Sequence, residues 1–253
     1  PYTAGSTGLD ALLPAGAYEG GVEKLLERLR DPEARRKIRE EMMRSWEDRG
    51  PDTLGAPEWS CIMISYCRGH PELEGRTIEE IAKERNVDPF DLVFDLLIEE
   101  EASVGIVLFT MCEEDMRRVL VHPLSMIGSD SSARAPYGVL GKGKPHPRTY
   151  GTFPRILGRY VREERLLTLE EAIRKMTSLP AQKLGLRDRG VIHEGAWADL
   201  VILDPERVID QATYQDPHRY PVGIEYVLVN GVIVIEREKH TKALPGRVLR
   251  HRS

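Results

Sequence analysis

The stretch with most chemical interest runs from Met126 to Ser132, where an apolar segment ends in Ser129, Asp130 and Ser131. A carboxylate just past the carboxyl end of a buried strand lies where the loops of barrel and open-sheet enzymes form active sites. Asp130 is therefore a candidate metal ligand or general base. Short Asp/Ser clusters also cap turns through their own backbone, and the spacing alone leaves this structural role equally open.

A long loop over residues 129–149, rich in Gly, Pro, Ser and Lys, follows this segment and ends beside a second candidate, Arg148. Loops of this length inside compact domains are usually functional or disordered, and we expect function here. Arg148 could orient an anionic substrate close to Asp130, because a planar guanidinium matches both oxygens of a carboxylate. A role as an ordinary surface arginine stays open. His146 precedes Pro147 in an extended backbone, and both catalysis and hydrogen bonding within the loop stay open for it.

Several familiar motifs are absent from the sequence. The run at 141–144, Gly-Lys-Gly-Lys, lacks the phosphate-loop frame and leads into a proline instead of a helix, and no G-x-S-x-G motif of a serine hydrolase occurs. Catalytic zinc needs about three protein ligands, for which two nearby histidines are a common source. The chain has seven histidines, none of which form an H-x-H or H-x-x-x-H pair: His70, His122, His146, His193, His218, His240 and His251. A metal facing Asp130 would therefore take most of its ligands from outside this sequence.

Composition excludes several classes of partner. The chain has 253 residues, of which 41% are hydrophobic and 30% charged, with a net charge of −5. That charge disfavours a nucleic-acid partner, and the apolar runs are too short to span a membrane. Cys61, Cys67 and Cys112 are an odd number without C-x-x-C spacing, which is typical of a reducing compartment. We expect a soluble cytoplasmic protein that binds neither nucleic acid nor membrane.

The apolar pattern predicts an α/β fold. Continuous apolar strands at 60–66, 104–110 and 124–128 alternate with helices, which predicts a parallel sheet covered on both faces. Asn230-Gly231 between two strand-like runs predicts a type I′ hairpin in an all-β tail. Helices are expected at 22–30, 32–49, 77–85, 89–100 and 113–121, with two more starting at 152 and 168, and the hairpin strands at 224–229 and 232–236.

Five stretches carry a resemblance to a known family. They are 1–7 (PYTAGST), 126–130 (MIGSD), 141–155 (GKGKPHPRTYGTFPR), 175–181 (KMTSLPA) and 245–249 (PGRVL). With them the chain resembles the C-terminal half of the N-acyl-D-amino-acid deacylases, or D-aminoacylases, of the amidohydrolase superfamily. The resemblance covers essentially the whole chain.

The resemblance implies the C-terminal part of a (β/α)₈ metal-dependent hydrolase barrel with inserted helices over residues 1–190, and a β-sandwich segment over 191–253. The strands at 104–110 and 124–129 would be the seventh and eighth of the barrel. The first six strands have no counterpart here, and a closed barrel leaves no open edges. We therefore expect a partial sequence, a proteolytic product or one chain of a split enzyme, whose partner is the missing N-terminal half of the barrel.

The activity implied by the resemblance is zinc-dependent hydrolysis of the N-acyl amide bond of small-molecule N-acyl-D-amino acids. Asp130 would contact the Zn²⁺ and carry the proton from the attacking water to the departing amine. Arg148 would hold the substrate α-carboxylate with help from Ser6. Ser131 stands where many family members have glycine. The family's histidine pair is missing, so most Zn²⁺ ligands are expected outside this chain.

Three leucines near Ser6, at positions 9, 12 and 13, favour an apolar pocket for the substrate side chain. Two alternatives to the deacylase stay open. One is another amidohydrolase, such as a hydantoinase-like or dihydroorotase-like cyclic amidase, whose ring-opening substrate need not present a carboxylate to Arg148. The other is a catalytically inactive chain that only pairs with a partner half.

Overall fold

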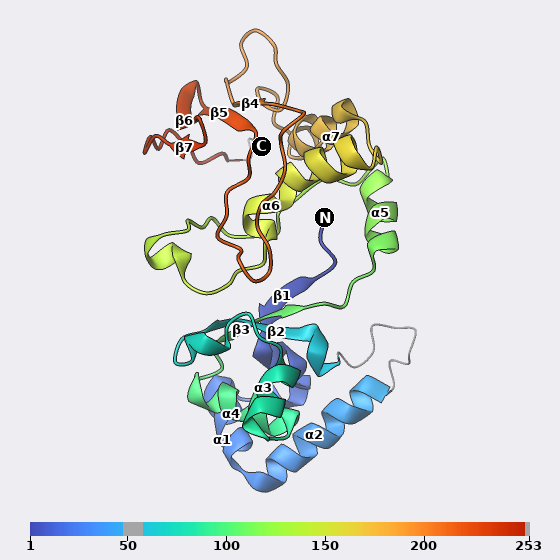
Figure 1. Cartoon of the computed structure of the whole chain (residues 1–253), viewed down its shortest axis with the longest axis vertical. Helices are drawn as coiled ribbons and strands as arrows, with labels where there is room; N and C mark the ends of the chain where they lie inside the picture. Colours follow the sequence, from blue (N-terminus) through green and yellow to red (C-terminus); the bar gives the residue numbers. More distant parts are fainter. Residues whose placement is uncertain (48–57, 251–253) are drawn as a thin grey trace. The chain divides into compact units, whose positions relative to one another are not determined.

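The computed structural model describes residues 1–47 and 58–250 and divides into two compact units. The N-proximal unit comprises Thr3–Glu113 and Ala135–His146, and the C-proximal unit comprises Pro1–Tyr2, Glu114–Arg134 and Pro147–Ser253 (Figure 1). These two units do not coincide with the boundary predicted after residue 190. That boundary separates a barrel part from a β-sandwich segment, and it stays a prediction.

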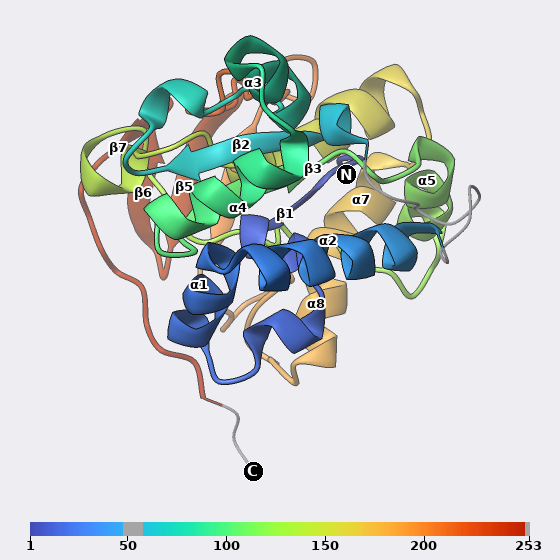
Figure 2. The same ribbon diagram turned by 90° about the horizontal axis from the view of Figure 1, so that it is seen from below.

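The N-proximal unit is a three-stranded sheet with helices on one side. The strands β1 (Gly5–Gly8), β3 (Val104–Leu108) and β2 (Ile62–Cys67) pair in that order. Helices lie in front of this sheet in the view of Figure 2. They are α1 (Val22–Arg30), α2 (Pro32–Glu47), α3 (Ile78–Arg85) and α4 (Pro89–Glu99). The unit also contains short 3₁₀ turns at Leu9–Leu12, Ala15–Tyr18, Trp59–Cys61, Pro71–Leu73 and Gly138–Gly141.

Local signals placed these helices correctly. The predicted capping box at α3 is formed, with Thr77 and Glu80 each bonding the other's backbone N–H, and Asp88 caps α4 ahead of its leading proline. The last two residues predicted for α2, 48 and 49, lie outside the described residues. Apolar side chains from α1, α3, α4, β2 and β3 form one core cluster.

The parallel sheet predicted from the apolar strands is wrong. β3 pairs antiparallel with both β1 and β2, with Ser6 opposite Val107 and Ile64 opposite Ile106. A continuous apolar run reports that a strand is buried, and Ile62, Ile64 and Ile106 are indeed fully buried. It carries no information on strand direction, which depends on partners far away in the sequence.

The C-proximal unit combines helices with an antiparallel sheet. Its helical part contains α5 (Glu113–Val121), α6 (Arg148–Arg155), a π-helix (Ile156–Glu163), α7 (Leu169–Met176) and α8 (Ser178–Lys183). Four strands follow in the order β4 (Leu200–Leu203), β5 (Ile224–Val229), β6 (Val232–Glu236) and β7 (Lys239–His240). Asn230 and Gly231 both have positive φ, 50° and 82°, which confirms the predicted hairpin and the all-β tail.

The strand predicted at 124–128 is also wrong. This segment has no regular secondary structure, and Leu124 is 75% exposed. Ile127 donates its amide to the carbonyl of Lys175 on α7 instead of joining a ladder of strands. An apolar run becomes a strand only where a neighbouring strand offers its backbone. The assignment of residues 104–110 to the seventh barrel strand therefore stays a prediction. The segment predicted as the eighth strand, 124–129, does not form a strand in this structure.

No helix within 1–47 and 58–250 combines the length and apolar character needed to cross a bilayer.

The helix predicted from residue 152 begins four residues earlier, at Arg148, and continues as a π-helix that packs closely on a distant loop. A Cβ at Gly158 would lie 2.6 Å from the Val208 carbonyl oxygen and 2.3 Å from Ile209 Cδ1. Arg162 adds a hydrogen bond of 2.7 Å from Nη1 to the same carbonyl. Glycine at position 158 thus permits a contact that fixes the helix carrying Arg148.

We predict that Gly158→Ala lowers the free energy of unfolding by about 1–3 kcal/mol, because the added methyl group displaces backbone atoms of residues 208–209. Urea denaturation followed by circular dichroism measures this change. Gly16→Ala is the matched control, since a Cβ at Gly16 meets nothing within 4 Å. Equal stability of the two variants would contradict the proposed close packing.

Candidate functional site

Asp130 and Arg148, the two residues singled out from the sequence, meet in the C-proximal unit. Arg148 Nη2 lies 3.0 Å from Asp130 Oδ2. The hydroxyls of Ser131 and Thr149 form a neighbouring hydrogen bond of 2.8 Å. The two ends of the loop predicted at 129–149 are therefore tied together by an ion pair and a hydrogen bond.

The two partners of this ion pair differ in how firmly they are held. The Arg148 side chain is 19% exposed, whereas that of Asp130 is 86% exposed. Asp130 follows an irregular segment and adopts a left-handed backbone with φ of 48°, a conformation that Asp tolerates better than most residues. Ion pairs with one partner this exposed contribute about 0–1 kcal/mol. The pair can therefore open at little cost.

Arg148 starts α6, and the chemistry of its neighbours explains why the helix begins there. Pro147 has φ of −58°, close to the helical value that its ring imposes. Its carbonyl accepts the amides of Tyr150 and Gly151 in the first turn. Thr152 Oγ1 donates to the Arg148 carbonyl over 2.8 Å. The guanidinium thus projects from a formed helical turn.

A cluster that sequence analysis missed anchors the other end of α6. Arg155 Nη1 lies 3.2 Å from Asp210 Oδ2, and the Tyr2 hydroxyl donates to the same oxygen over 2.9 Å. Arg155 Nε also donates to the Pro1 carbonyl over 3.1 Å. Gly151 permits the approach, since a Cβ there would lie 2.2 Å from the Tyr2 hydroxyl. No spacing signal in the sequence connects residues 1 and 2 with residue 210.

Tyrosines in this region remain neutral at physiological pH. Burial, reinforced by Asp210, raises the pKa of Tyr2, and burial raises the pKa of Tyr214 to about 12 although Arg155 and Arg148 act in the opposite direction. Tyr150 bonds His218 Nδ1 through its hydroxyl over 3.1 Å. The hydroxyls of Tyr2, Tyr150 and Tyr214 can orient polar atoms but stay protonated near neutral pH.

Ser6 and His146 belong to the N-proximal unit. Ser6 is exposed on β1, and its predicted place beside Arg148 stays a prediction. His146 is 3% exposed and its Nε2 lies 3.0 Å from the Ala4 carbonyl oxygen, which favours the structural interpretation of this histidine. The apolar pocket predicted from the leucines near Ser6 is wrong for two of them, because Leu9 and Leu13 are buried in the core.

The described residues do not form a zinc site by themselves. Within 1–47 and 58–250, no three His, Cys, Asp or Glu side chains come together as a metal would require. Asp130 is exposed and bonded to a guanidinium, so it offers at most one carboxylate ligand. That most ligands lie outside this chain stays a prediction.

Comparison with known proteins identifies the family. The model of the amidohydrolase family matches residues 13–235. The chain therefore belongs to the amidohydrolase family. An N-acyl-D-glutamate deacylase of Alcaligenes xylosoxydans xylosoxydans is 42% identical over 189 residues, which are 75% of this chain and 36% of that protein. A D-aminoacylase of the same organism is 41% identical over 187 residues, 74% of this chain and 36% of that protein.

Solved structures agree. An N-acyl-D-glutamate deacylase from Bordetella bronchiseptica, complexed with zinc and a phosphonate inhibitor that mimics the tetrahedral intermediate, superposes with a TM-score of 0.65 at 34% identity, over 92% of this chain and 38% of that one. A crystal structure of D-aminoacylase gives 0.67 at 36% identity, over 96% and 40%. The resemblance inferred from the sequence is confirmed. The chain spans little more than a third of the length of these relatives, 36% of each Alcaligenes protein.

We predict that Asp210→Asn lowers the free energy of unfolding by about 1–3 kcal/mol, because it removes the charge that Arg155 faces in a largely buried setting. Thermal and urea denaturation measure this loss. Asp216→Asn is the control, since the side chains of Asp216 and its partner Arg219 are 54% and 58% exposed. An unchanged Asp210→Asn protein would show that the cluster does not anchor α6.

Proposed function

We propose that this chain is part of a zinc-dependent amidohydrolase that cleaves N-acyl-D-amino acids into a carboxylate and a free D-amino acid. The observation that carries the proposal is the ion pair between Asp130 and Arg148, found in a chain whose relatives are named as deacylases of this substrate class. The names of these relatives favour a deacylase over a cyclic amidase.

Arg148 is proposed to bind the substrate α-carboxylate. Its guanidinium projects from the first turn of α6 and is mostly buried, so its position is set before substrate arrives. In this structure it already holds one carboxylate, that of Asp130, at 3.0 Å. A substrate carboxylate can take that place, since it offers two oxygens to a planar fork and replaces a contact of small net value.

Asp130 is proposed to accept the proton of the attacking water and to pass it to the departing amine. The water oxygen bonds to the acyl carbon and the C–N bond breaks. The amine nitrogen receives the proton that Asp130 carries, so Asp130 ends as the carboxylate that it was at the start. Exchange of Arg148 from Asp130 to the substrate would free the carboxylate for this task in the same step that places the substrate.

Metal binding is proposed to be shared with residues outside this chain. Asp130 is the ligand proposed from this chain, and further ligands would come from the segment that the relatives carry beyond the matched third of their length. On this proposal the chain is the C-terminal part of the barrel with a β-sandwich segment, and Ser6 assists Arg148. We call this chain together with that complementary segment the assembled enzyme. Its cytoplasmic location stays a prediction.

We predict that Arg148→Ala in the assembled enzyme lowers kcat/KM for an N-acetyl-D-amino acid roughly 100-fold, because the substrate carboxylate loses its charged partner. The corresponding N-acetyl-D-amino acid amide lacks that carboxylate, and its kcat/KM should change less than about threefold. Steady-state kinetics on both substrates measure the difference.

Arg187→Ala is the matched control, since Arg187 is exposed and belongs to neither anchor of α6. An Arg148→Ala enzyme with unchanged kcat/KM on the free acid would refute the deacylase assignment. So would an equal loss on the acid and the amide, because Arg148 would then act on something other than the carboxylate.

A further inference from the structure

Lys175 is an unusual side chain for the interior of a protein. It lies on α7 and is 0% exposed. Burying an ammonium group costs several kcal/mol unless hydrogen bonds and opposite charge replace its water. The contacts that surround Lys175 should therefore show what this group contributes.

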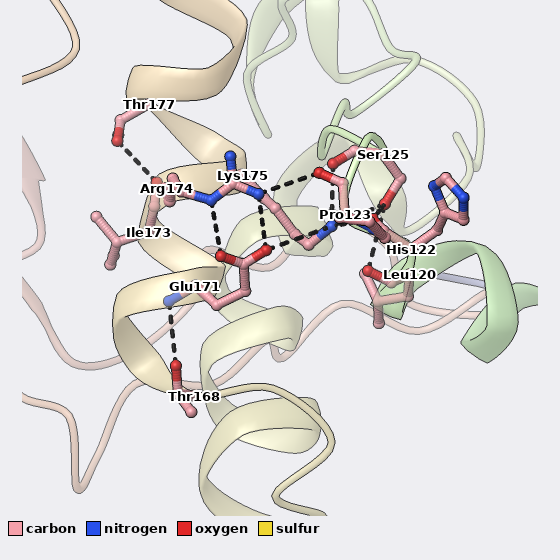
Figure 3. Close-up of polar contacts among 10 residues, drawn as sticks. All are labelled: Leu120, His122, Pro123, Ser125, Thr168, Glu171, Ile173, Arg174, Lys175 and Thr177. Carbon is pink, nitrogen blue, oxygen red and sulfur yellow. Dashed lines mark hydrogen bonds and ion pairs between the residues drawn. The ribbon is translucent and has the colours of Figure 1, made fainter.

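The hydrogen bonds that its ammonium group donates lie on one turn, residues 122–125, which precedes Asp130. Nζ donates to the His122 carbonyl over 2.5 Å, to the Ser125 carbonyl over 3.1 Å and to Ser125 Oγ over 3.0 Å. Three acceptors match the three N–H donors of an ammonium group. Figure 3 shows the lysine reaching from α7 into this turn.

Two neighbours on α7 reinforce this contact. Arg174 Nη2 donates to the Pro123 carbonyl over 3.1 Å. Arg174 also donates to the Glu171 carboxylate, through Nε over 2.7 Å and through Nη2 over 2.8 Å. Glu171 Oε1 lies 3.7 Å from Lys175 Nζ and supplies the opposite charge. Hydrogen bonding from Arg174 lowers the pKa of Glu171, so this carboxylate stays ionised across the neutral range.

The backbone of Lys175 continues the contact toward Asp130. Its carbonyl accepts the amide of Ile127. One residue of α7 therefore holds the chain at 122, 125 and 127, just ahead of the irregular segment that ends in Asp130. Since that segment forms no strand, its path depends on such side-chain and backbone anchors.

We propose that Lys175 is a positioning residue that sets the place of the Asp130 carboxylate by clamping the turn at 122–125. The inference rests on the proposed role of Asp130 in proton transfer. A misplacement of about 1 Å in a reacting group can cost about 100-fold in rate. Loss of the clamp therefore affects the chemical step, while Arg148 on α6 continues to bind the substrate.

The test uses Lys175→Met in the assembled enzyme, which keeps an apolar stem of similar size and removes the ammonium. We expect kcat to fall roughly 10- to 100-fold with KM within about threefold of wild type. Hydrogen exchange at the Ile127 amide should accelerate while exchange in the β5–β6 hairpin stays unchanged. Lys183→Met on α8, an exposed lysine, is the control and should keep wild-type kinetics.

A second variant covers the case in which Lys175→Met does not fold. Ser125→Ala removes one acceptor of Nζ and leaves the ammonium with its two carbonyls. We expect a fall in kcat of about threefold to tenfold with KM unchanged. Rescue adds a third readout: ethylammonium should restore part of the kcat of Lys175→Ala, and ethanol should not.

The outcomes separate this inference from the proposed function. Suppose that Asp130→Asn is inactive but that folded Lys175→Met keeps wild-type kcat, or that Ser125→Ala does so where Lys175→Met does not fold. The positioning role of Lys175 is then overturned, and the proposed function survives. If Asp130→Asn keeps wild-type turnover, the proton-transfer role of Asp130 fails and the inference fails with it. A merely structural lysine would lower the folded fraction and leave kcat per folded molecule unchanged.

Discussion

The contact between Arg148 and Asp130 is the interaction on which this account depends. It joins a largely buried guanidinium to a largely exposed carboxylate at 3.0 Å. A pair of this kind adds little to stability because water competes for the exposed partner. The pair keeps the Arg148 guanidinium oriented to bind a carboxylate. Arg148 can exchange Asp130 for a substrate carboxylate without a large change in free energy.

The two residues of the pair are held by different means. Arg148 belongs to a helix whose far end is fixed by Arg155, Asp210 and Tyr2, and whose π-helical continuation packs on residues 208–209. Asp130 has no regular element of its own, and its segment is anchored by α7 through Lys175. Substrate binding and proton transfer therefore depend on separate supports. This separation explains why changes in one support should alter KM and changes in the other kcat.

The sequence predicted what depends on neighbours within a few residues. The capping box of Thr77 and Glu80 and the turn at Asn230-Gly231 each follow from local backbone chemistry, and both formed as expected. Strand direction and the strand at 124–128 could not be predicted, because they depend on which backbone lies alongside. The apolar segment 124–128 is instead bound to helix α7, through the hydrogen bond from the Ile127 amide to the Lys175 carbonyl.

The candidate site was predictable in part for the same reason. Asp130 and Arg148 could be chosen from their residue types and loop position, and family resemblance strengthened the choice. The residues that support them could not be predicted. The hydrogen bond between Tyr2 and Asp210 spans 208 positions, and a lysine such as Lys175 would normally be assigned to the surface of its helix. Buried charged groups on otherwise ordinary helices are signals that only coordinates reveal.

The most direct test is a crystal structure of the assembled enzyme with a slowly hydrolysed N-acyl-D-amino acid analogue. We expect both oxygens of the analogue's α-carboxylate to lie within hydrogen-bonding distance of the Arg148 guanidinium. The Asp130 carboxylate should be released from Arg148 and face the scissile amide. An analogue whose carboxylate is bound elsewhere, while Arg148 and Asp130 remain paired, would contradict this expectation.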